Sequence, residues 1–363
     1  MWIKAAVLRS ADGPFLIEDV ELCDPAPDEV RLRISGTGLC HTDLLPRHPG
    51  FAAVSPIVLG HEASGVVDAV GEAVTNVVVG DHVVASFDSC RQCATCTSGH
   101  PAYCDGFVVR NLTGVGIEHS DSVLDIDGNT IASRWFGQSS FASHAIVAAR
   151  NIVKVDPSLP LELLGPLGCG MLTGAGSIFG ALGVTRGSSV VAFGAGSVGL
   201  SAVMAARVVG AAVIVAVDVH PARLQWAREL GATHVVPGAA DDLSEQLAEA
   251  TGGGADYALD TTGIPAVVQV AIRSLKRTGT CGLVGAQQGP LMLEPIDLAF
   301  GRTVKGILVG DAVPEVVIPH LIELWQQGCF PFDRLVTRYR LDQINEAESA
   351  SLRGEVVKAV LVP

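Results

Sequence analysis

Positive charge is scarce in this chain of 363 residues, which has 24 Lys and Arg against 38 Asp and Glu and a formal net charge of −14. A surface this acidic repels phosphate backbones, which argues against nucleic acid as a partner. Long apolar runs are also missing, because Arg207 and Gly210 interrupt the run from Leu200 to Val217, so we expect no membrane span. Only four apolar residues separate Lys4 from Arg9, too few for a signal-peptide core. These absences predict a soluble, cytoplasmic protein.

The nine cysteines need a role other than disulfide bonds, because cytosolic thiols are normally kept reduced. Four of them fall within fifteen residues: Cys90, Cys93, Cys96 and Cys104. Four thiolates at this spacing can close tetrahedrally on one zinc ion and leave no open position, which is typical of a structural site. An iron–sulfur cluster and unliganded thiols are the alternatives. We interpret Cys23, Cys281 and Cys329 as small buried thiols.

The first part of the chain, to about residue 150, is rich in short β-type runs broken by Gly and Pro. The expected strands are Ala5–Leu8, Val30–Ser35, Gly65–Val70, His82–Ser86 and Ala145–Ala148. Short strands with frequent turn signals predict an antiparallel or barrel-like domain. After about Phe300 the pattern is irregular and ends in a strand-like segment, Val356–Val362, which we expect to return to this first domain.

The middle of the chain alternates between apolar strands and helices. The expected strands are Ser189–Phe193, Ala212–Val217, His234–Val236, Tyr257–Asp260 and Thr280–Val284, and the expected helices are Val198–Val209, Pro221–Leu230, Leu243–Ala250 and Ala266–Leu275. This alternation predicts a parallel, doubly wound α/β sheet. The predicted domains are therefore residues 1–165, completed by 305–363, and residues 166–304.

A glycine-rich motif follows the first of these strands and opens a helix: Gly194-Ala195-Gly196-Ser197-Val198-Gly199. Alone it is a weak signal, but the strand and helix around it are typical of a dinucleotide site, where the helix N-terminus faces the pyrophosphate. Asp218, 19 residues after Gly199, ends the next strand and can accept from the ribose hydroxyls. That carboxylate would repel a 2′-phosphate, which favours NAD over NADP. Arg223 is expected near the adenosine ribose or a phosphate.

A second metal constellation is dispersed along the chain. Cys40 follows an expected strand, His61 lies in Gly60-His61-Glu62, and Cys169 lies in Gly168-Cys169-Gly170. Separately each is ordinary, but together they supply three protein ligands and an open fourth position, the catalytic pattern of zinc. Such an ion is a Lewis acid that lowers the pKa of a bound hydroxyl, as it lowers that of water from about 16 to about 7.

These motifs resemble the medium-chain, zinc-containing alcohol dehydrogenase family over nearly the whole chain. The runs that resemble its bacterial aryl-alcohol (benzyl alcohol) dehydrogenase branch are Glu162-Leu163-Leu164-Gly165-Pro166-Leu167-Gly168-Cys169-Gly170 and, later, Gln326-Gln327-Gly328 with Phe330-Pro331-Phe332-Asp333. The family implies a GroES-like catalytic domain, a Rossmann domain that binds NAD, and two zinc ions per subunit. It also implies a homodimer or homotetramer that acts on a small alcohol or aldehyde.

The resemblance assigns roles to residues beside the metal. Cys40, His61 and Cys169 would bind catalytic zinc, with Glu62 just behind it. Asp43 would orient the zinc-bound imidazole of His61. Thr42 would bond the alcohol oxygen and take its proton.

The resemblance also places residues around the cofactor. His41 and Lys358 match basic positions that contact the phosphates. Thr173 would touch the nicotinamide, as would backbone at Val284, Ala286 and Ile307–Val309.

One departure concerns the proton relay. Many relatives carry a histidine where this sequence has Leu45, three residues after Thr42. Proton exit then needs another route, through water or His48, and we expect less dependence on a base with a pKa near 7.

By family position, Trp135 and Phe136 would line the substrate channel, together with Phe87 and Phe51. The alternative for the pair Trp135-Phe136 is buried core. A channel walled by aromatic side chains stabilises a bound planar ring by about 1–3 kcal/mol through burial and stacking. It does not supply the convergent hydrogen bonds that a polyol needs. We therefore expect a primary aromatic or allylic alcohol as the substrate.

Three other functions remain open at this point. A glutathione-dependent formaldehyde dehydrogenase would want basic residues at the mouth of the cleft. A non-catalytic zinc- and dinucleotide-binding protein would lack at least one of Cys40, Thr42, His61 or Cys169, and all are present. A zinc-free quinone reductase is disfavoured by these residues and by the four clustered cysteines.

Overall fold

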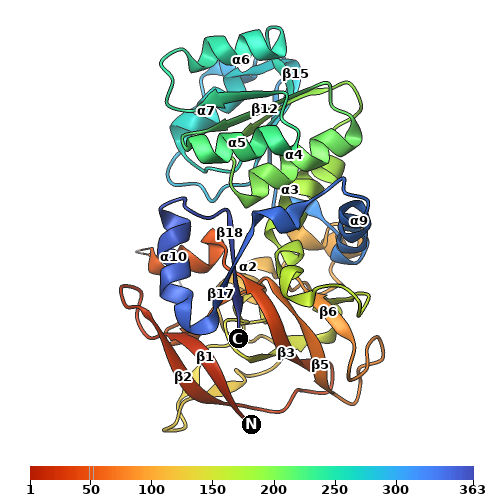
Figure 1. Cartoon of the computed structure of the whole chain (residues 1–363), viewed down its shortest axis with the longest axis vertical. Coiled ribbons are helices and arrows are strands. Elements are labelled where there is room, and N and C mark those ends of the chain that lie inside the picture. Colours follow the sequence, from red (N-terminus) through yellow and green to blue (C-terminus); the bar gives the residue numbers. More distant parts are fainter. Residues whose placement is uncertain (49, 52) are drawn as a thin grey trace. The chain divides into compact units, whose positions relative to one another are not determined.

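The computed structural model describes residues 1–48, 50–51 and 53–363, and the chain divides into two compact units (Figure 1). Unit 1 comprises residues 1–169, 313–319 and 333–363, and unit 2 comprises residues 170–312 and 320–332. The domain limits given above remain a prediction. Among the described residues, no helix is both long enough and apolar enough to cross a bilayer.

Unit 1 is built mainly from short strands. One sheet contains, in spatial order, β4 (Ile57–Val58), β1 (Trp2–Leu8), β2 (Phe15–Leu22), β7 (Val123–Leu124) and β8 (Thr130–Ile131). Another contains β10 (Ile152–Lys154), β6 (His82–Ala85), β5 (Ala63–Val70), β3 (Glu29–Gly38), β18 (Lys358–Val362) and β17 (Val336–Arg340), with β9 (His144–Ala148) also paired to β3. Buried side chains alternate along β3, where Val30, Leu32 and Ile34 face the core.

Short helices connect these strands and carry much of the candidate chemistry. They are η1 (His41–Arg47), α1 (Ala94–Thr97), η2 (Pro101–Tyr103), α2 (Phe107–Leu112), η3 (Trp135–Gly137), η4 (Ala149–Asn151), η5 (Leu161–Leu163), η6 (Gly165–Gly168), η10 (Leu341–Gln343) and α10 (Ile344–Leu352). The predicted return of the tail is confirmed, because β18 pairs antiparallel with β3 through Val360 and Gly38.

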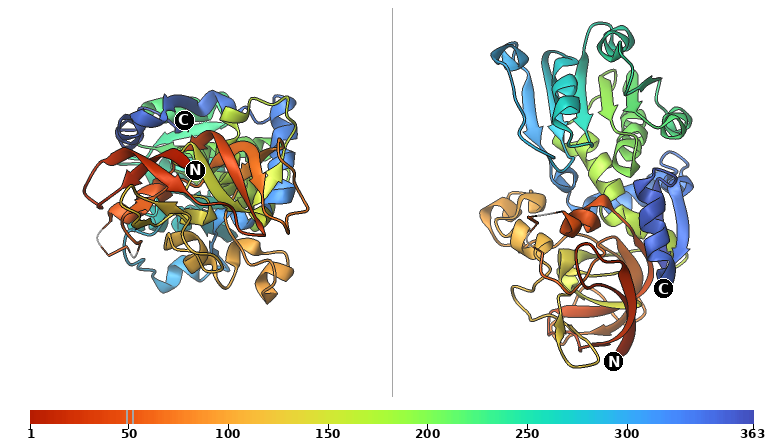
Figure 2. Two further views of the ribbon diagram at one scale, coloured as in Figure 1. Left: turned by 90° about the horizontal axis from the view of Figure 1, so that it is seen from below. Right: turned by 90° about the vertical axis from the view of Figure 1, so that its left-hand side faces the viewer.

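Unit 2 contains a parallel sheet. Its spatial order is β13 (His234–Pro237), β12 (Val213–Asp218), β11 (Ser189–Phe193), β14 (Ala255–Asp260), β15 (Leu275–Leu283) and β16 (Thr303–Gly306). The helices are α3 (Gly170–Gly176), the π-helix η7 (Ser177–Ala181), α4 (Ser197–Val209), α5 (Pro221–Leu230), α6 (Leu243–Thr251), α7 (Pro265–Arg273), α8 (Pro295–Leu298) and the short η8 (Val309–Asp311). Helices lie on both faces of this sheet (Figure 2), which confirms the predicted α/β class.

The region after Phe300 is more helical than the sequence indicated. It contains α9 (Pro314–Gln326), η9 (Phe332–Leu335) and α10 before the final strand. Pro319 lies inside α9, and an internal proline removes a helical hydrogen bond and so argues against a helix in the sequence. The expectation of an irregular segment was wrong for that reason.

Candidate active site

The structure brings the dispersed metal ligands together within unit 1. Cys40 precedes η1, His61 lies before β5, and Cys169 follows η6. One ligand atom from each of these residues and from Glu62 lies within 4.8 Å of the others. Nε2 of His61 is 3.2 Å from Sγ of Cys169, close to the roughly 3.5 Å between a sulfur and a nitrogen on one tetrahedral zinc. The donor set therefore fits zinc.

Glycines allow this convergence. A Cβ at Gly165 would lie 2.1 Å from the carbonyl oxygen of Glu62, and one at Gly168 would lie 2.0 Å from that of Ala85. A Cβ at Gly38 would lie 1.9 Å from Oε2 of Glu62. A larger residue at Gly165 or Gly168 would push the Cys169 segment away from the backbone at Glu62 and Ala85.

Asp43 holds the imidazole of His61. Its Oδ1 lies 2.7 Å from Nδ1 of His61 and accepts the backbone N–H of Gly60 at 3.1 Å, while Oδ2 accepts the N–H of Cys40 at 3.0 Å. Because Nδ1 bonds to the carboxylate, Nε2 is left to face the sulfurs. The predicted position of Asp43 behind His61 matches this geometry.

Without a metal, the ligands share protons. The thiol of Cys169 bonds to Cys40, which raises the pKa of Cys169 and lowers that of Cys40. Burial lowers the pKa of His61, but the charge and hydrogen bond of Asp43 outweigh burial and raise that pKa to about 10. A metal ion must therefore displace protons from Cys169 and His61.

Lys358, which the resemblance assigns to a cofactor phosphate, is buried beside Glu62 in this structure. Its Nζ is 2.9 Å from both carboxylate oxygens of Glu62 and 3.3 Å from the carbonyl oxygen of Leu39, and its side chain is 1% exposed. The phosphate contact of Lys358 stays a prediction. Burial raises the pKa of Glu62, the Lys358 ammonium opposes this, and the carboxylate raises the pKa of Lys358.

Thr42 and His41 stand at the start of η1. The hydroxyl of Thr42 lies 3.7 Å from Sγ of Cys40, beside the candidate metal position. The side chain of His41 is exposed, so a phosphate could reach it. The side chain of His48 is also exposed, and the backbone N–H of this residue donates to the carbonyl oxygen of Leu45.

The four clustered cysteines converge separately, around α1 and η2. Their sulfurs lie within 4.8 Å of one another, with Sγ of Cys90 and Cys96 3.9 Å apart, close to the roughly 3.8 Å expected on one tetrahedral zinc. Backbone N–H groups of Cys93 and Cys96 donate to the sulfurs of Cys90 and Cys93. Backbone donors, that of Gln92 first, lower the pKa of Cys90 to about 6. This geometry suits a metal with a closed shell of thiolates.

Of the remaining cysteines, Cys281 is buried, as predicted, but Cys23 and Cys329 are exposed. Cys23 directly follows the end of β2, and Cys329 follows the end of α9, where the chain meets solvent.

The glycine motif forms the predicted tight turn in unit 2. Gly194 has φ of +90°, and a Cβ at Gly199 would lie 1.8 Å from the carbonyl oxygen of Gly194. A Cβ at Gly196 meets nothing within 4 Å, so open space faces the turn there. Gly196 caps α4 without a side chain, and the first N–H groups at Ser197 and Val198 face that end of the helix.

The other predicted cofactor residues lie in the same unit. Oδ2 of Asp218 accepts the N–H of Ala195 at 2.7 Å, which fixes the carboxylate beside the turn. Arg223 lies 3.9 Å from Asp218, and its Nε is buried without a partner among the described residues. Thr173 is 5% exposed on α3. Val284 and Ala286 follow β15, where Val284 is partly buried and Ala286 is exposed.

The predicted substrate-pocket residues form an aromatic cluster. Phe51 and Trp135 meet edge to face at 6.0 Å, Trp135 and Phe136 at 5.6 Å, and Phe87 lies 6.0 Å from Phe107. Trp135 is 0% exposed and its indole N–H donates to Asp43 at 3.0 Å. Phe87 and Phe136 are also buried, and only Phe51 is partly exposed. Trp135 is thus part of the packed core and does not border open space here.

Sequence reasoning missed Gln138. Its side-chain amide donates to the carbonyl oxygens of His61, at 3.0 Å, and Ser86, at 2.8 Å, and accepts the N–H of Ala63. Nothing in the sequence separates it from a surface glutamine, because the contacts depend on the turn after Trp135.

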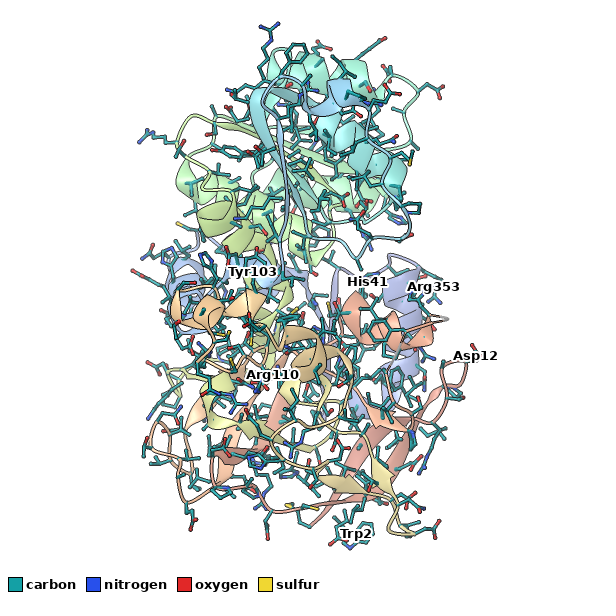
Figure 3. The ribbon with its side chains drawn as sticks, turned by 180° about the vertical axis from the view of Figure 1, so that it is seen from behind. Trp2, Asp12, His41, Tyr103, Arg110 and Arg353 are labelled. Atoms are coloured by element: carbon teal, nitrogen blue, oxygen red, sulfur yellow. The ribbon has the colours of Figure 1, made fainter. Side chains whose placement is uncertain are left out.

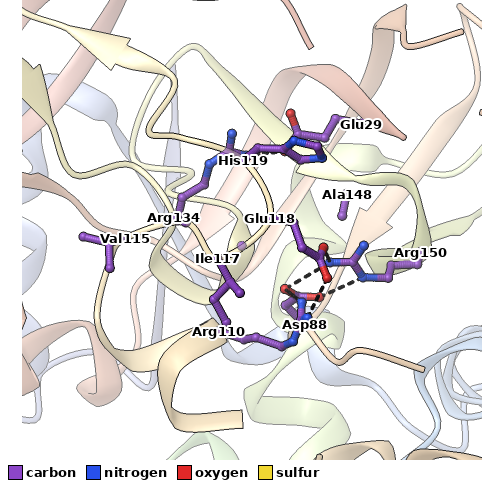
Figure 4. Close-up of a pocket in the computed structure, with 12 residues that line it drawn as sticks. Glu29, Asp88, Arg110, Val115, Ile117, Glu118, His119, Arg134, Ala148 and Arg150 are labelled. Atoms are coloured by element: carbon purple, nitrogen blue, oxygen red, sulfur yellow. Dashed lines mark hydrogen bonds and ion pairs between the residues drawn. The ribbon is translucent and has the colours of Figure 1, made fainter. Parts of the chain in front are cut away.

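A cavity of about 40 Å³ in unit 1 is lined by Arg134 and Gly137, on either side of Trp135 and Phe136, and by several further charged residues. Arg110 bonds to Asp88 at 3.0 Å and to Glu118 at 2.6 Å, and Arg150 bonds to Glu118 at 2.7 Å (Figure 4). Arg110 on α2 and His41 on η1 are well separated in Figure 3. Because the charged side chains that line the cavity pair with one another, we interpret them as a structural ion-pair network.

Comparison with known proteins gives consistent matches. Residues 26–157 match the alcohol dehydrogenase GroES-like domain, and residues 197–326 match the zinc-binding dehydrogenase family. A geraniol dehydrogenase of Castellaniella defragrans is 48% identical over 99% of this chain and 97% of that protein. A zinc-binding alcohol dehydrogenase domain protein from Burkholderia ambifaria superposes with a TM-score of 0.97 at 46% identity, covering 100% of this chain and 99% of that one. The benzyl alcohol dehydrogenase of Acinetobacter calcoaceticus superposes with a TM-score of 0.96 at 41% identity and the same coverage.

Proposed function

Because this chain belongs to the family of zinc-binding alcohol dehydrogenases, we propose that Cys40, His61 and Cys169 hold its catalytic zinc. The chain is a zinc-dependent alcohol dehydrogenase. We propose that it oxidises a primary aromatic or allylic alcohol reversibly to the aldehyde, with NAD as hydride acceptor. The observation that carries the site assignment is the convergence of two sulfurs, an imidazole and a carboxylate within 4.8 Å.

Each residue of the site has a separate role in this proposed reaction. When bound, zinc lowers the pKa of the alcohol hydroxyl, and NAD accepts the hydride. Thr42, whose hydroxyl lies beside Cys40, would orient the alcohol and relay its proton, giving up its own hydroxyl proton toward water or His48 as it accepts that of the alcohol. Asp43 keeps Nε2 of His61 directed at the sulfurs. The Lys358 ammonium pairs with the Glu62 carboxylate and would keep it from binding the metal. Cys40, His61 and Cys169 would then be the three protein ligands, with a fourth position for substrate.

The choice of NAD rests on Asp218. Its carboxylate is fixed by the N–H groups of Ala195 and His220 at the end of β12, where a 2′-phosphate would meet negative charge. The glycine turn at the start of α4 supports the binding of a dinucleotide in general. The preference for NAD is our proposal.

The substrate class rests on the aromatic cluster and on relatives named for benzyl alcohol and geraniol. Phe51, the partly exposed member, offers a ring face or edge, and the buried rings of Trp135 and Phe136 support it from behind. Such a wall favours a planar, apolar substrate over a polyol, which needs convergent hydrogen bonds.

We propose that the enzyme is a homodimer or homotetramer that assembles through unit 2. Large apolar side chains are exposed along one segment before β16: Met292, Leu293, Ile296, Leu298 and Phe300. Apolar side chains concentrated in this way are typical of an interface. A cytoplasmic location is proposed because all nine cysteines are unpaired and six of them lie in the two candidate metal sites.

A panel of alcohols assayed with NAD⁺ and NADP⁺, alongside zinc counting, tests these proposals. We expect two zinc ions per chain and a higher kcat/KM for benzyl alcohol and geraniol than for ethanol. A fully metallated, folded protein with one zinc, held by the four clustered cysteines, would contradict the catalytic site. A higher kcat/KM for ethanol would contradict the substrate class alone.

A further inference from the structure

The turn from Trp135 to Ser139 surrounds His61 on several sides. Its backbone is strained, because Phe136 has φ of +51° and Ser139 has φ of +49°, a left-handed conformation that residues other than glycine rarely adopt. Trp135 N–H donates to Oγ of Ser139 at 2.9 Å, which closes the turn on itself. Strain of this kind persists only where the surroundings impose it, and it concentrates at functional sites.

Three side-chain contacts run from this turn to His61. The indole N–H of Trp135 donates to Oδ1 of Asp43 at 3.0 Å, the same oxygen that bonds to Nδ1 of His61. The ring of Phe136 stacks on the imidazole, with centroids 4.3 Å apart and planes 25° apart. Gln138 donates to the carbonyl oxygen of His61 at 3.0 Å.

We propose that this turn is a clamp that fixes the imidazole of His61 as a metal ligand, and that Trp135 is its polar positioning residue. The inference rests on the proposed ligand set. Oδ1 of Asp43 lies between the two donors, His61 and Trp135, and Oδ2 is held by the N–H of Cys40, so the carboxylate cannot rotate without breaking one of these bonds. Phe136 then restricts rotation of the ring that Asp43 orients.

Burial alone does not account for this arrangement. A buried indole needs an acceptor, but any backbone carbonyl would serve that need. Here the indole donates to a fully buried carboxylate that already serves the candidate ligand. The left-handed backbone of Phe136 also places its ring on the imidazole of His61. The strained backbone and the ring stacking therefore have the same structural cause.

The test is Trp135→Phe, which removes the N–H and keeps an aromatic ring. Zinc loss to a chelator is followed from the holoenzyme, with the four-cysteine site as an internal reference. Because changes behind a metal ligand typically cost 10–100-fold in affinity, we expect the catalytic zinc to leave about tenfold faster while the other zinc leaves at the wild-type rate. The absorption bands of enzyme with Co²⁺ in the catalytic site should shift as well.

Trp325→Phe is the matched control. Trp325 packs edge to face on Phe332 at 5.2 Å within unit 2, and this variant should lose both zinc ions at wild-type rates. Phe136→Leu removes the stack and should also accelerate loss of the catalytic zinc alone, so the test survives if Trp135→Phe does not fold. Wild-type zinc loss in Trp135→Phe, or equal acceleration at both sites, overturns the inference. A wild-type protein with a single zinc would instead overturn the proposed function.

Discussion

Lys358 and Glu62 form a fully buried ion pair in which Nζ lies 2.9 Å from each carboxylate oxygen. The two residues are 296 positions apart in the sequence. Their pairing explains how a carboxylate can be kept beside three metal ligands without becoming a fourth. It gives Lys358 a role inside unit 1, while its expected phosphate contact stays a prediction.

Removing the ammonium should therefore destabilise the fold. Lys358→Met leaves the Glu62 charge buried and uncompensated, and we expect a loss of about 3–5 kcal/mol in the free energy of unfolding. Urea unfolding measures this loss. The double variant Lys358→Met with Glu62→Gln removes both charges and should recover most of it. If Lys358→Met kept wild-type stability but bound NADH more weakly, Lys358 would be a phosphate contact after all.

Zinc binding to the catalytic site should be coupled to pH. The pKa of His61 is about 10 in the metal-free site, above its usual 6.5, so the protonated imidazole stabilises the metal-free fold below pH 6.5 and this stabilisation is lost as pH rises through 10. Cys169 also keeps its proton because the neighbouring Cys40 raises its pKa. Zinc affinity should therefore rise across this range, with release of about two protons at pH 8.

Calorimetry in buffers of different ionisation enthalpy measures this proton release, once the four-cysteine site has been filled. The variant Asp43→Asn should release about one proton fewer, because without the carboxylate the pKa of His61 falls and a neutral imidazole has no proton to release. Zinc binding without proton release at pH 8 would contradict the shared-proton arrangement.

Two glycines of the dinucleotide turn should respond differently to the same added methyl group. In Gly199→Ala the new Cβ lies 1.8 Å from the carbonyl oxygen of Gly194, so helix and strand must separate and unit 2 should lose about 2 kcal/mol or more of stability. In Gly196→Ala the Cβ meets no protein atom within 4 Å, so stability should be unchanged.

NADH titration then separates fold from binding in these two variants. Gly196→Ala should bind NADH at least tenfold more weakly, because backbone at this position approaches the pyrophosphate. Wild-type NADH affinity in Gly196→Ala would show that the cofactor phosphates lie elsewhere.

Cofactor choice should depend on Asp218. Asp218→Ala removes the charge that a 2′-phosphate would meet, and we expect the ratio of kcat/KM for NAD⁺ over NADP⁺ to fall by at least tenfold. Asp241→Ala, on an exposed acid of the same unit, is the control and should leave the ratio unchanged. Unaltered selectivity in Asp218→Ala would count against the assignment of this residue.

The sequence predicted those parts of the fold and site that have a local signature. The β11 strand, the glycine motif and Asp218 lie within 30 residues of one another, and their roles follow from spacing. The four clustered cysteines are equally local. Even the dispersed ligands Cys40, His61 and Cys169 each lie in a short motif, and it was their combination that indicated a metal.

Other features depended on geometry that no local pattern encodes. The sequence left Trp135 open between a substrate channel and buried core. In the structure its indole is buried and turned toward Asp43, next to the left-handed backbone of Phe136. The partner of Glu62 comes from β18, and a lysine at that position carries no mark of burial in the sequence. Gln138 has its role only because the turn brings it to the carbonyl oxygen of His61.

The place of β18 between β3 and β17 has a consequence for biosynthesis. A ribosome makes the chain from the N-terminus, so β3 and the Glu62 segment emerge long before the strand that completes their sheet. The strands of unit 2 follow one another closely and can pair during translation, whereas the Glu62 segment waits for a partner that is made 296 residues later. We therefore expect the proposed metal centre to mature only after β18 has been made, on a nascent protein whose parallel sheet in unit 2 has already formed.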